Sequence, residues 1–356
     1  MNNFQGKRIL ITGHTGFKGF WLSMILKSLG ADVTGVSLKI NRNIKSHFET
    51  LDGESLIKTH YIDIRNLSLL KELIEKIKPN YIFHLAAQAL VSESFRDPVN
   101  TFTTNTIGSI NLLESLREIN LECNAIMITS DKVYENVEWV YGYRENDKLG
   151  GSDPYSASKA CAELSIRSYF KSFLNNSNIK LCIARAGNVI GGGDWSQNRL
   201  IPDCIRSWTK KEVVKLRSPN STRPWQHVFD PINGYLTLAL KLNQDKSLSG
   251  ESFNFGPDHL SDITVLKAVK KLSQKWGENA TYIIENQNFM KEAKLLRLNC
   301  DKAHSLLNWK PMMDLDKCVD MTVEWYKRSN LGKVQTAEIS KLQVDWFVSN
   351  FLNKDF

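Results

Sequence analysis

The stretch ILITGHTGFKGFWLSMIL, from Ile9 to Leu26, joins a short apolar run, a glycine-rich turn and a stretch of helical period. Gly13, Gly16 and Gly19 follow a G-x-x-G-x-x-G spacing at that turn. Glycine permits a tight turn, lets backbone amides approach a pyrophosphate and lets the helix pack close to the strand. Three glycines also suit a plain tight turn, so the surrounding pattern has to decide between a nucleotide site and a simple reversal.

The same alternation continues along the next part of the chain. The apolar runs DVTGVSL, YIFHLAA, AIMITS and LCIARAG alternate with helical stretches such as INLLESLREIN. This order predicts βαβ units and an α/β fold with a doubly wound parallel sheet. We expect a dinucleotide-binding Rossmann domain over residues 1–187, with a return segment near 228–256. Residues 188–227 and 257–330 are expected to form a smaller C-terminal α/β region that binds the substrate, followed by a helical tail at 331–356.

Composition narrows the class of protein. The chain has 356 residues, of which 42% are hydrophobic, enough for one large domain with a smaller one. No apolar run approaches the roughly 20 residues that span a bilayer, and the N-terminus enters a strand without a signal-peptide core, so we expect a cytoplasmic protein with no membrane partner. The net charge of +8 is spread without a long basic block, which favours a small anionic ligand over nucleic acid. The six cysteines and seven histidines show no metal-ligand spacing, so no metal is expected.

The end of the second strand bears on cofactor choice. A dinucleotide site usually has an acidic residue there for the ribose hydroxyls, but DVTGVSL ends in Ser37 and Leu38. Lys39 and Arg42 follow, and their charge keeps NADP open beside NAD. Asp63, in YIDIRN after the third strand, could hold an adenine edge or could be a helix cap.

A tyrosine, two lysines and an aspartate stand at positions typical of catalysis. Tyr155 and Lys159 in DPYSASKACAEL lie four apart on one face of a helix that Pro154 helps to start. A tyrosine is normally protonated below pH ~10, so a base role near neutrality requires a nearby cation. Lys159 or a positive nicotinamide ring could supply that cation; a half-buried amphipathic helix is the alternative. In ITSDKVYEN, Asp131 directly precedes Lys132 at the end of a strand.

These residues carry a family resemblance. The three glycines, HLAAQ at 84–88, Asn105, and Tyr155 with Lys159 together resemble the extended short-chain dehydrogenase/reductase family. The blocks TSDKVYEN, GGSDPYSASKACAEL, RAGNVIGGGDW, RLIPD, RPWQHV and FNFGP resemble its nucleotide-sugar 4,6-dehydratases, most closely the branch that acts on CDP-glucose. The resemblance reaches to about residue 330 and implies tightly held NAD. The cofactor residues expected from these patterns are Gly13, Thr15, Gly16, Phe17, Gly19, Asp63, Ile64, Leu85, Ala86, Ala87, Asn105, Tyr155 and Lys159.

The resemblance also implies a mechanism. Such enzymes remove a hydride from C4 of the sugar, expel water across C5 and C6, and return the hydride to C6. This requires an acid at the C6 hydroxyl and a base at C5. By resemblance Asp131 is the acid, and Ser130 hydrogen-bonds near the C4 hydroxyl and Tyr155. Lys132 stands where related dehydratases often have Glu; it is the candidate base, or else an ion-pair partner of Asp131 that shapes the loop.

Substrate residues are expected mainly after residue 187. An arginine fork matches phosphate oxygens, so the arginines of LRSPNSTRPWQHV are candidates for the sugar-nucleotide pyrophosphate. Ser92 and Phe95 stand where relatives commonly have Arg and Tyr, so the fine contacts of the sugar differ. The full expected set is Gln88, Asn188, Arg199, Arg217, Arg223 and His227.

Two questions stay open at this level. The resemblance implies a homodimer in which two helices of each subunit form a four-helix bundle, for which TFTTNTIGSINLLESLREI and the helix after Tyr155 are candidates; both could equally pack within one chain. A dehydratase for another nucleotide sugar, a nucleotide-sugar C4 epimerase or reductase, and a dinucleotide sensor without activity are the alternatives. The sensor would be expected to lack Tyr155 or Lys159, and an epimerase would leave Asp131 without a task.

Overall fold

The computed structural model describes residues 3–40, 45–119, 121–216, 218–257, 263–285 and 295–353. Arg42 and Arg217, both singled out by the sequence, lie outside these ranges. The centre is a seven-stranded sheet in the order β11-β6-β5-β4-β1-β2-β3. The pairs within this sheet are parallel. The strands are β1 (Arg8–Thr12), β2 (Asp32–Ser37), β3 (Lys58–Tyr61), β4 (Tyr81–His84), β5 (Cys123–Ile128), β6 (Ile179–Ala186) and β11 (Ser252–Phe255).

This order confirms the predicted doubly wound α/β fold. The chain runs outward from β1 to β3 and then returns to place β4 on the other side of β1. In open parallel sheets, ligands bind outside the carboxyl ends of the strands at this reversal. The glycine turn follows β1 and the HLAAQ segment includes the end of β4, so both motifs meet at the reversal.

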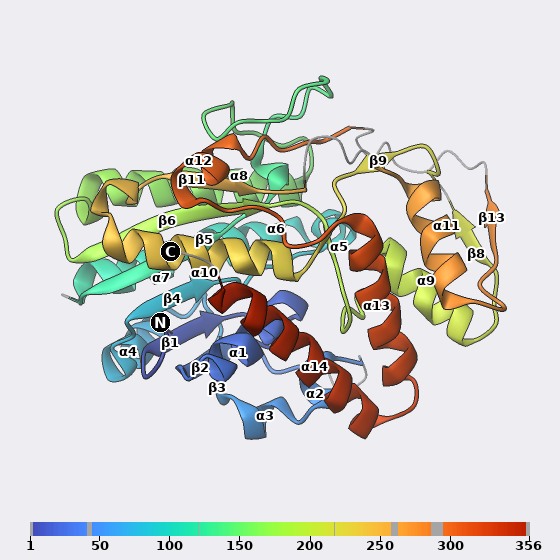
Figure 1. Ribbon diagram of the computed structural model, residues 1–356. Coiled ribbons are helices and arrows are strands. Elements are labelled where there is room, and N and C mark those ends of the chain that lie inside the picture. The colour runs from blue at the N-terminus through green and yellow to red at the C-terminus, as the bar shows by residue number, and fades with distance from the viewer. Residues whose placement is uncertain are drawn as a thin grey trace.

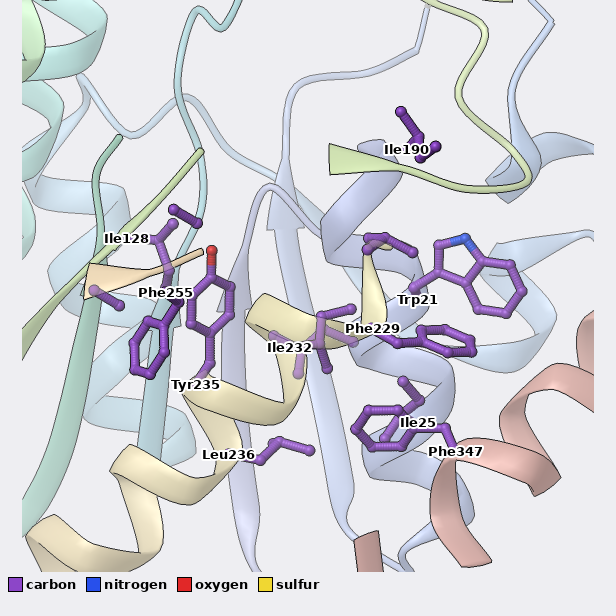
Figure 2. Close-up of a cluster of buried hydrophobic side chains, with 14 of the residues drawn as sticks. Trp21, Ile25, Ile128, Ile190, Phe229, Ile232, Tyr235, Leu236, Phe255 and Phe347 are labelled. Atoms are coloured by element: carbon purple, nitrogen blue, oxygen red, sulfur yellow. The ribbon is translucent and has the colours of Figure 1, made fainter. Parts of the chain in front are cut away.

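Helices cover both faces of the sheet (Figure 1). On one face lie α4 (Leu67–Ile77), α7 (Gly108–Glu118) and α8 (Pro154–Tyr169), and on the other α1 (Phe17–Ser28) and α10 (Phe229–Gln244). Side chains of one strand alternate between the two cores, as the pleat requires. In β5, Met127 belongs to the core under α7, whereas Ile126 and Ile128 belong to the core shared with α1 and α10. Figure 2 shows part of that second core.

Helix α8, which carries Tyr155 and Lys159, begins as its sequence predicts. The Asp153 carboxylate accepts a hydrogen bond from the backbone N–H of Ser156 at 2.9 Å, and Pro154 occupies the first turn. The helix continues into a π-helical turn, η3 (Phe170–Leu174). Before α7, the chain forms α5 (Val91–Arg96), α6 (Pro98–Phe102) and a second π-helical turn, η1 (Thr103–Ile107).

The second region lies beside the carboxyl ends of the strands, at the right of Figure 1. It holds three two-stranded sheets and the helices α9 (Leu200–Thr209), α11 (Val265–Trp276) and α13 (Leu315–Ser329). The strand pairs are β7 (Val189–Ile190) with β10 (Gln226–His227), β9 (Thr222–Arg223) with β12 (Ile263–Thr264), and β8 (Val214–Leu216) with β13 (Tyr282–Ile284).

The remaining elements are short, except for the last helix. They are α2 (His47–Thr50), α3 (Gly53–Leu56), η2 (Asp131–Val133), η4 (Lys246–Leu248), α12 (Asp301–Leu307) and α14 (Lys333–Leu352). In Figure 1, α14 crosses α1 and lies beside α13. Within the described ranges, no helix combines the length and apolarity needed to cross a membrane.

Candidate active site

The glycine turn is shaped by close backbone contacts. Gly13 has φ +78°, and a Cβ at this residue would lie 2.7 Å from the backbone nitrogen of Ala86. A Cβ at Gly19 would lie 2.1 Å from the carbonyl oxygen of Gly13. Any side chain would therefore push the turn away from the end of β4 or push α1 away from the turn. Gly16 is the N-cap of α1 and no side chain among the described residues caps it, which leaves this helix N-terminus suited to an anion.

A pair of hydroxyls stands where a carboxylate was expected at the end of β2. Thr15 donates a hydrogen bond to Ser37 Oγ at 3.1 Å, and Ser37 donates to the carbonyl oxygen of Leu38 at 2.9 Å. The Lys39 side chain is exposed to solvent. The ribose end of a dinucleotide would therefore meet neutral hydroxyls beside this lysine.

The loop after β4 is held by buried polar groups. Thr12 Oγ1 accepts a hydrogen bond from the Ala86 backbone N–H at 3.2 Å and bonds His84 Nδ1 at 2.8 Å. Burial lowers the pKa of His84 to about 3, so this imidazole is neutral. These contacts hold Ala86 in position against the glycine turn.

Asn105 connects this loop to α8. Its side chain accepts from the Gln88 backbone N–H at 2.8 Å and donates to Ser158 Oγ at 2.9 Å. The Gln88 side chain also has protein partners: it donates to Thr101 Oγ1 at 2.8 Å and accepts from the Leu90 N–H at 2.6 Å. In this arrangement the Gln88 amide is engaged by the protein, which sequence reasoning did not anticipate for a substrate residue.

At the adenine end, Asp63 forms an ion pair with Arg65 at 2.6 Å. The hydrogen bond from Arg65 holds the pKa of the Asp63 carboxyl below its usual range. Ile64 is buried against Gly108 at the start of α7. Asp63 is therefore ionised and oriented before any ligand binds.

Four predicted catalytic residues meet at the carboxyl end of β5. Ser130, Asp131, Tyr155 and Lys159 are all buried, Asp131 with 3% and Tyr155 with 9% of its surface exposed. Ser130 Oγ donates to Asp131 Oδ1 at 2.9 Å and is also hydrogen-bonded to Tyr155. The fifth, Lys132, is half-buried in η2 next to Asp131, and its backbone N–H donates to Ser130 Oγ at 3.2 Å. Ser130 thus links Asp131, the candidate acid, to Tyr155, the candidate base for the C4 hydroxyl.

Burial controls the charge state of this cluster. Burial raises the pKa of the Asp131 carboxyl, even though Lys132, Ser130, Lys18 and Arg223 all oppose the shift. This favours a protonated Asp131, as an acid requires. Burial also raises the pKa of Tyr155, with the hydrogen bond between Ser130 and Tyr155 opposing this rise. The lowering of the Tyr155 pKa that a base role requires is therefore not supplied by the protein side chains alone.

Lys159 has a second lysine near it, Lys18, which the sequence did not single out. Burial, and then the charge of Lys18, lower the pKa of Lys159 to about 8. Lys18 is in the first turn of α1 and is half-buried; desolvation and the charge of Arg199 lower its pKa to about 8, while Asp131 raises it. The sequence did contain one signal for Lys18, its position in the first turn of the helix after the glycines. A helix N-terminus disfavours a cation unless a nearby group compensates its charge.

Two arginines reach the cluster from the second region. Arg199, just before α9, forms an ion pair with Asp194 at 3.0 Å, and its charge influences the pKa of both Lys18 and Tyr155. Arg223 is in β9, where its guanidinium donates to the carbonyl oxygen of Thr222 at 2.8 Å, and its charge acts on Asp131. Asn188 is half-buried just after Gly187, which lies against the Asp131 carboxyl. The site is thus strongly cationic, as a diphosphate ligand requires.

His227 is placed differently from these residues. Its side chain is fully buried in β10, Nδ1 accepts from the Phe229 backbone N–H at 3.3 Å, and the ring contacts the Phe229 ring. Nε2 faces Gly191, where a Cβ would lie 3.3 Å away. Burial lowers the pKa of His227 to about 3, so the imidazole is neutral.

A buried ion pair holds α8 against the sheet. Glu163, one turn beyond Lys159 on α8, pairs with Arg185 of β6, and neither side chain is exposed. Glu163 also accepts from Thr129, the neighbour of Ser130, at 3.3 Å. Arg185 reaches Tyr134 as well. One buried pair therefore ties α8 to the strand end that carries Ser130 and Asp131.

Comparison with known proteins gives a consistent result. A family model described as GDP-mannose 4,6 dehydratase matches residues 10–322. A curated CDP-glucose 4,6-dehydratase from Salmonella typhimurium is 43% identical over 331 residues, which is 92% of each chain. Among solved structures, a dTDP-glucose 4,6-dehydratase from Bacillus anthracis in complex with NAD has a TM-score of 0.74 at 21% identity, covering 93% of this chain and 100% of that one. A UDP-glucuronic acid 4-epimerase from Bacillus cereus, with UDP-glucuronic acid and NAD, has a TM-score of 0.78 at 24% identity, covering 90% and 99%.

Proposed function

Because this chain belongs to the GDP-mannose 4,6-dehydratase family, we propose that it converts CDP-glucose into CDP-4-dehydro-6-deoxyglucose through bound NAD. The observation that carries the proposal is the buried Asp131, whose pKa is raised, hydrogen-bonded through Ser130 to Tyr155. A C4 epimerase or reductase uses the tyrosine but has no step for an acid at C6. The 43% identity to a CDP-glucose 4,6-dehydratase favours CDP-glucose over other nucleotide sugars.

The cofactor residues fit NAD sterically and electrostatically. Gly13, Gly16 and Gly19 leave room at the N-terminus of α1 for a pyrophosphate, and Asp63, ionised and paired with Arg65, is the candidate for an adenine edge. When bound, NAD accepts the hydride from C4 and returns it to C6. Thr15 and Ser37 place two hydroxyls at the end of β2, near the expected position of the adenosine ribose.

The side chains then divide the proton transfers. Tyr155 accepts the C4 hydroxyl proton as C4 is oxidised, with Ser130 hydrogen-bonded between it and Asp131. Once C4 is a ketone, the C5 proton becomes acidic, and Lys132 is the candidate base that removes it. Asp131 donates its proton to the C6 oxygen, which leaves as water. The C5 position regains a proton and C6 receives the hydride, so the reaction is redox-neutral.

Substrate binding is proposed for residues 188–227 and 257–330. Arg199 and Arg223, with Lys18 from α1, would neutralise the pyrophosphate, and Asn188 would contact the sugar. Arg217, which lies outside the described residues, stays a further candidate from the sequence, and His227 would support the chain from beneath Gly191.

A label experiment tests the function. Deuterium placed at C4 of CDP-glucose is expected at C6 of the product, because one site removes and returns the same hydride. The product is identified by NMR, with dTDP-, GDP- and UDP-glucose as alternative substrates. Label lost to solvent would contradict internal transfer, and a 4-epimer without a deoxysugar would establish the epimerase.

Lys132 is tested through proton exchange at C5. Turnover in deuterium oxide should place solvent deuterium at C5 of the product, and Lys132→Met is expected to slow product formation about 10²-fold or more, as for a positioned general base. Lys148→Met is a matched control, since Lys148 is exposed in the loop beyond and pairs only with Glu135 at 2.6 Å among the described contacts. Undiminished C5 exchange in Lys132→Met would assign the base elsewhere.

We also propose a homodimer formed through a four-helix bundle. Exposed apolar side chains gather on the helices that would form it: Val99 of α6, Ile107 of η1, Leu164 of α8 and Phe173 of η3. Leu164→Glu would bury a charge in that interface and is expected to shift the protein from dimer to monomer in analytical ultracentrifugation. Leu331→Glu, at an exposed leucine between α13 and α14, is the matched control. A monomeric wild type, or dissociation by the control variant, would contradict the proposal.

A cytoplasmic location is proposed with this function. The six cysteines, all within the described residues, form no disulfide, as is usual in a reducing compartment. Cell fractionation with a periplasmic marker tests it, and co-fractionation with that marker would contradict it.

A further inference from the structure

The glycine run after β7 is enclosed by three aromatic side chains from distant parts of the sequence. A Cβ at Gly192 would lie 2.1 Å from the Trp325 ring of α13, and one at Gly193 would lie 2.7 Å from the His47 ring of α2. Trp21 of α1 donates its indole N–H to the carbonyl oxygen of Gly192 at 2.8 Å. The position of this turn is therefore set by how Trp21, His47 and Trp325 pack around it.

The C-terminal helix holds two of these three rings. Ser340 of α14 is buried, with 1% exposed. Its Oγ accepts from Trp325 Nε1 at 2.9 Å and lies 2.9 Å from His47 Nε2. Burial lowers the pKa of His47 to about 3, so the imidazole is neutral and Nε2 can accept the Ser340 hydroxyl proton. One hydroxyl thus joins α13 to α2.

Apolar contacts keep α14 at this place. Figure 2 shows Phe347 of α14 beside Phe229 and Ile25, and the rings of Phe347 and Phe229 are 5.2 Å apart. Gln343 donates to the carbonyl oxygen of Met321 of α13 at 2.8 Å. The helix is therefore anchored to both the Rossmann part and α13 around Ser340.

The Gly191–Gly193 turn is followed at once by Asp194, which holds the candidate substrate residue Arg199. Tyr326, the neighbour of Trp325, donates to the carbonyl oxygen of Asp194 at 2.5 Å. The Asp194 carboxylate, almost fully buried, holds Arg199 at 3.0 Å. Trp325 and Tyr326, adjacent residues of α13, thus contact the chain at Gly192 and at Asp194, on either side of Gly193.

We propose that Ser340 is a positioning residue that sets the affinity for the nucleotide-sugar diphosphate, acting through Trp325, the Gly191–Gly193 turn and the Asp194–Arg199 pair. The inference rests on the proposed function for the identity of the ligand. It gives the C-terminal helix a task in substrate binding at a distance from the reacting atoms.

The test compares binding and turnover in three variants. Ser340→Ala removes both hydrogen bonds and is expected to raise the dissociation constant of CDP-glucose about 5-fold, with kcat changed less than about 2-fold. Ser340→Thr keeps the hydroxyl and should restore affinity. Ser115→Ala is the matched control, because Ser115 is also a buried helical serine but donates only to the carbonyl oxygen of Asn111 in its own helix, at 2.8 Å. Binding is measured by calorimetry on the NAD-loaded protein.

A double-mutant cycle separates positioning from a general loss of stability. In an Arg199→Gln background, Ser340→Ala should change affinity less than about 2-fold, because the pathway ends at Arg199. Unchanged affinity in Ser340→Ala, equal loss in Ser115→Ala, or full additivity with Arg199→Gln would overturn the inference.

The proposed function is judged separately, by the wild type. If it binds CDP-glucose but forms no deoxysugar, that function fails while the ratio of variant to wild-type affinity still decides the inference. If it instead binds dTDP-, GDP- or UDP-glucose, the same ratio is measured with that sugar nucleotide. Failure of the wild type to bind any of the four would overturn both.

Discussion

Replacing Tyr155 by phenylalanine is expected to lower kcat about 10²-fold or more, the loss usual for a positioned general base. The change removes only the phenolic oxygen, which is hydrogen-bonded to Ser130 in a buried site. Without that oxygen the C4 hydroxyl proton has no acceptor, so oxidation at C4 should fail. No reduced-nicotinamide absorbance should therefore form when CDP-glucose is added to the NAD-loaded variant.

The control for this prediction lies on the same helix. Tyr169 is the last residue of α8, and Tyr169→Phe removes the same atom away from the cluster. Its turnover should stay close to wild type. If Tyr155→Phe forms reduced cofactor at the wild-type rate, the base is another group, and Tyr155 only shapes the site.

Replacing Asp131 by asparagine is expected to block the reaction at a later point. The amide keeps the shape of the carboxyl but cannot supply a proton to the departing C6 oxygen, so turnover should fall about 10²-fold or more. Oxidation at C4 does not use this acid, so the variant should accumulate bound reduced cofactor, visible by its absorbance, where wild type shows little. Tyr155→Phe and Asp131→Asn should thus differ in what accumulates as well as in rate.

The pH profile gives Asp131 a second test. The acid must be protonated, so its contribution to kcat is present below its raised pKa and is lost as the pH rises through that value. Asp131→Asn should lose this alkaline limb. A separate limb near pH 8 should remain, because Lys159, whose pKa is lowered to about 8, then loses its positive charge. Asp32, an exposed carboxyl at the start of β2, is the control, and Asp32→Asn should keep the wild-type pH profile. A wild-type profile in Asp131→Asn would reject the acid role.

Local patterns were sufficient to predict the sheet and the residues of the candidate active site. The glycine turn, the alternation of apolar runs and the Tyr155–Lys159 spacing each depend on residues within a few turns of one another. The structure confirms the doubly wound fold. It also buries Ser130, Asp131, Tyr155 and Lys159 at the predicted site.

What sequence reasoning missed depends on contacts between distant segments. Lys18 looks like an ordinary solvent-facing lysine until Arg199 and Asp131 are brought beside it, from far along the chain. The Gln88 amide looks available until Thr101 and Leu90 are seen to engage it. Ser340 acquires a task only when α14 folds back onto His47 and Trp325. None of these contacts produces a periodic pattern or a motif in the sequence from which it could be predicted.

The strand order also has a consequence for how the protein is made. β6 ends at Ala186, and its outer neighbour β11 begins only at Ser252. During synthesis at roughly 5–20 residues per second, the outer edge of β6, with its unpaired backbone N–H and C=O groups, therefore waits several seconds for its partner. An unpaired strand edge invites association with other chains, so a nascent chain stalled between these strands is exposed to aggregation. Slow translation through residues 187–251 should make the cell depend on chaperones at this stage, even though the finished sheet leaves β6 paired on both sides.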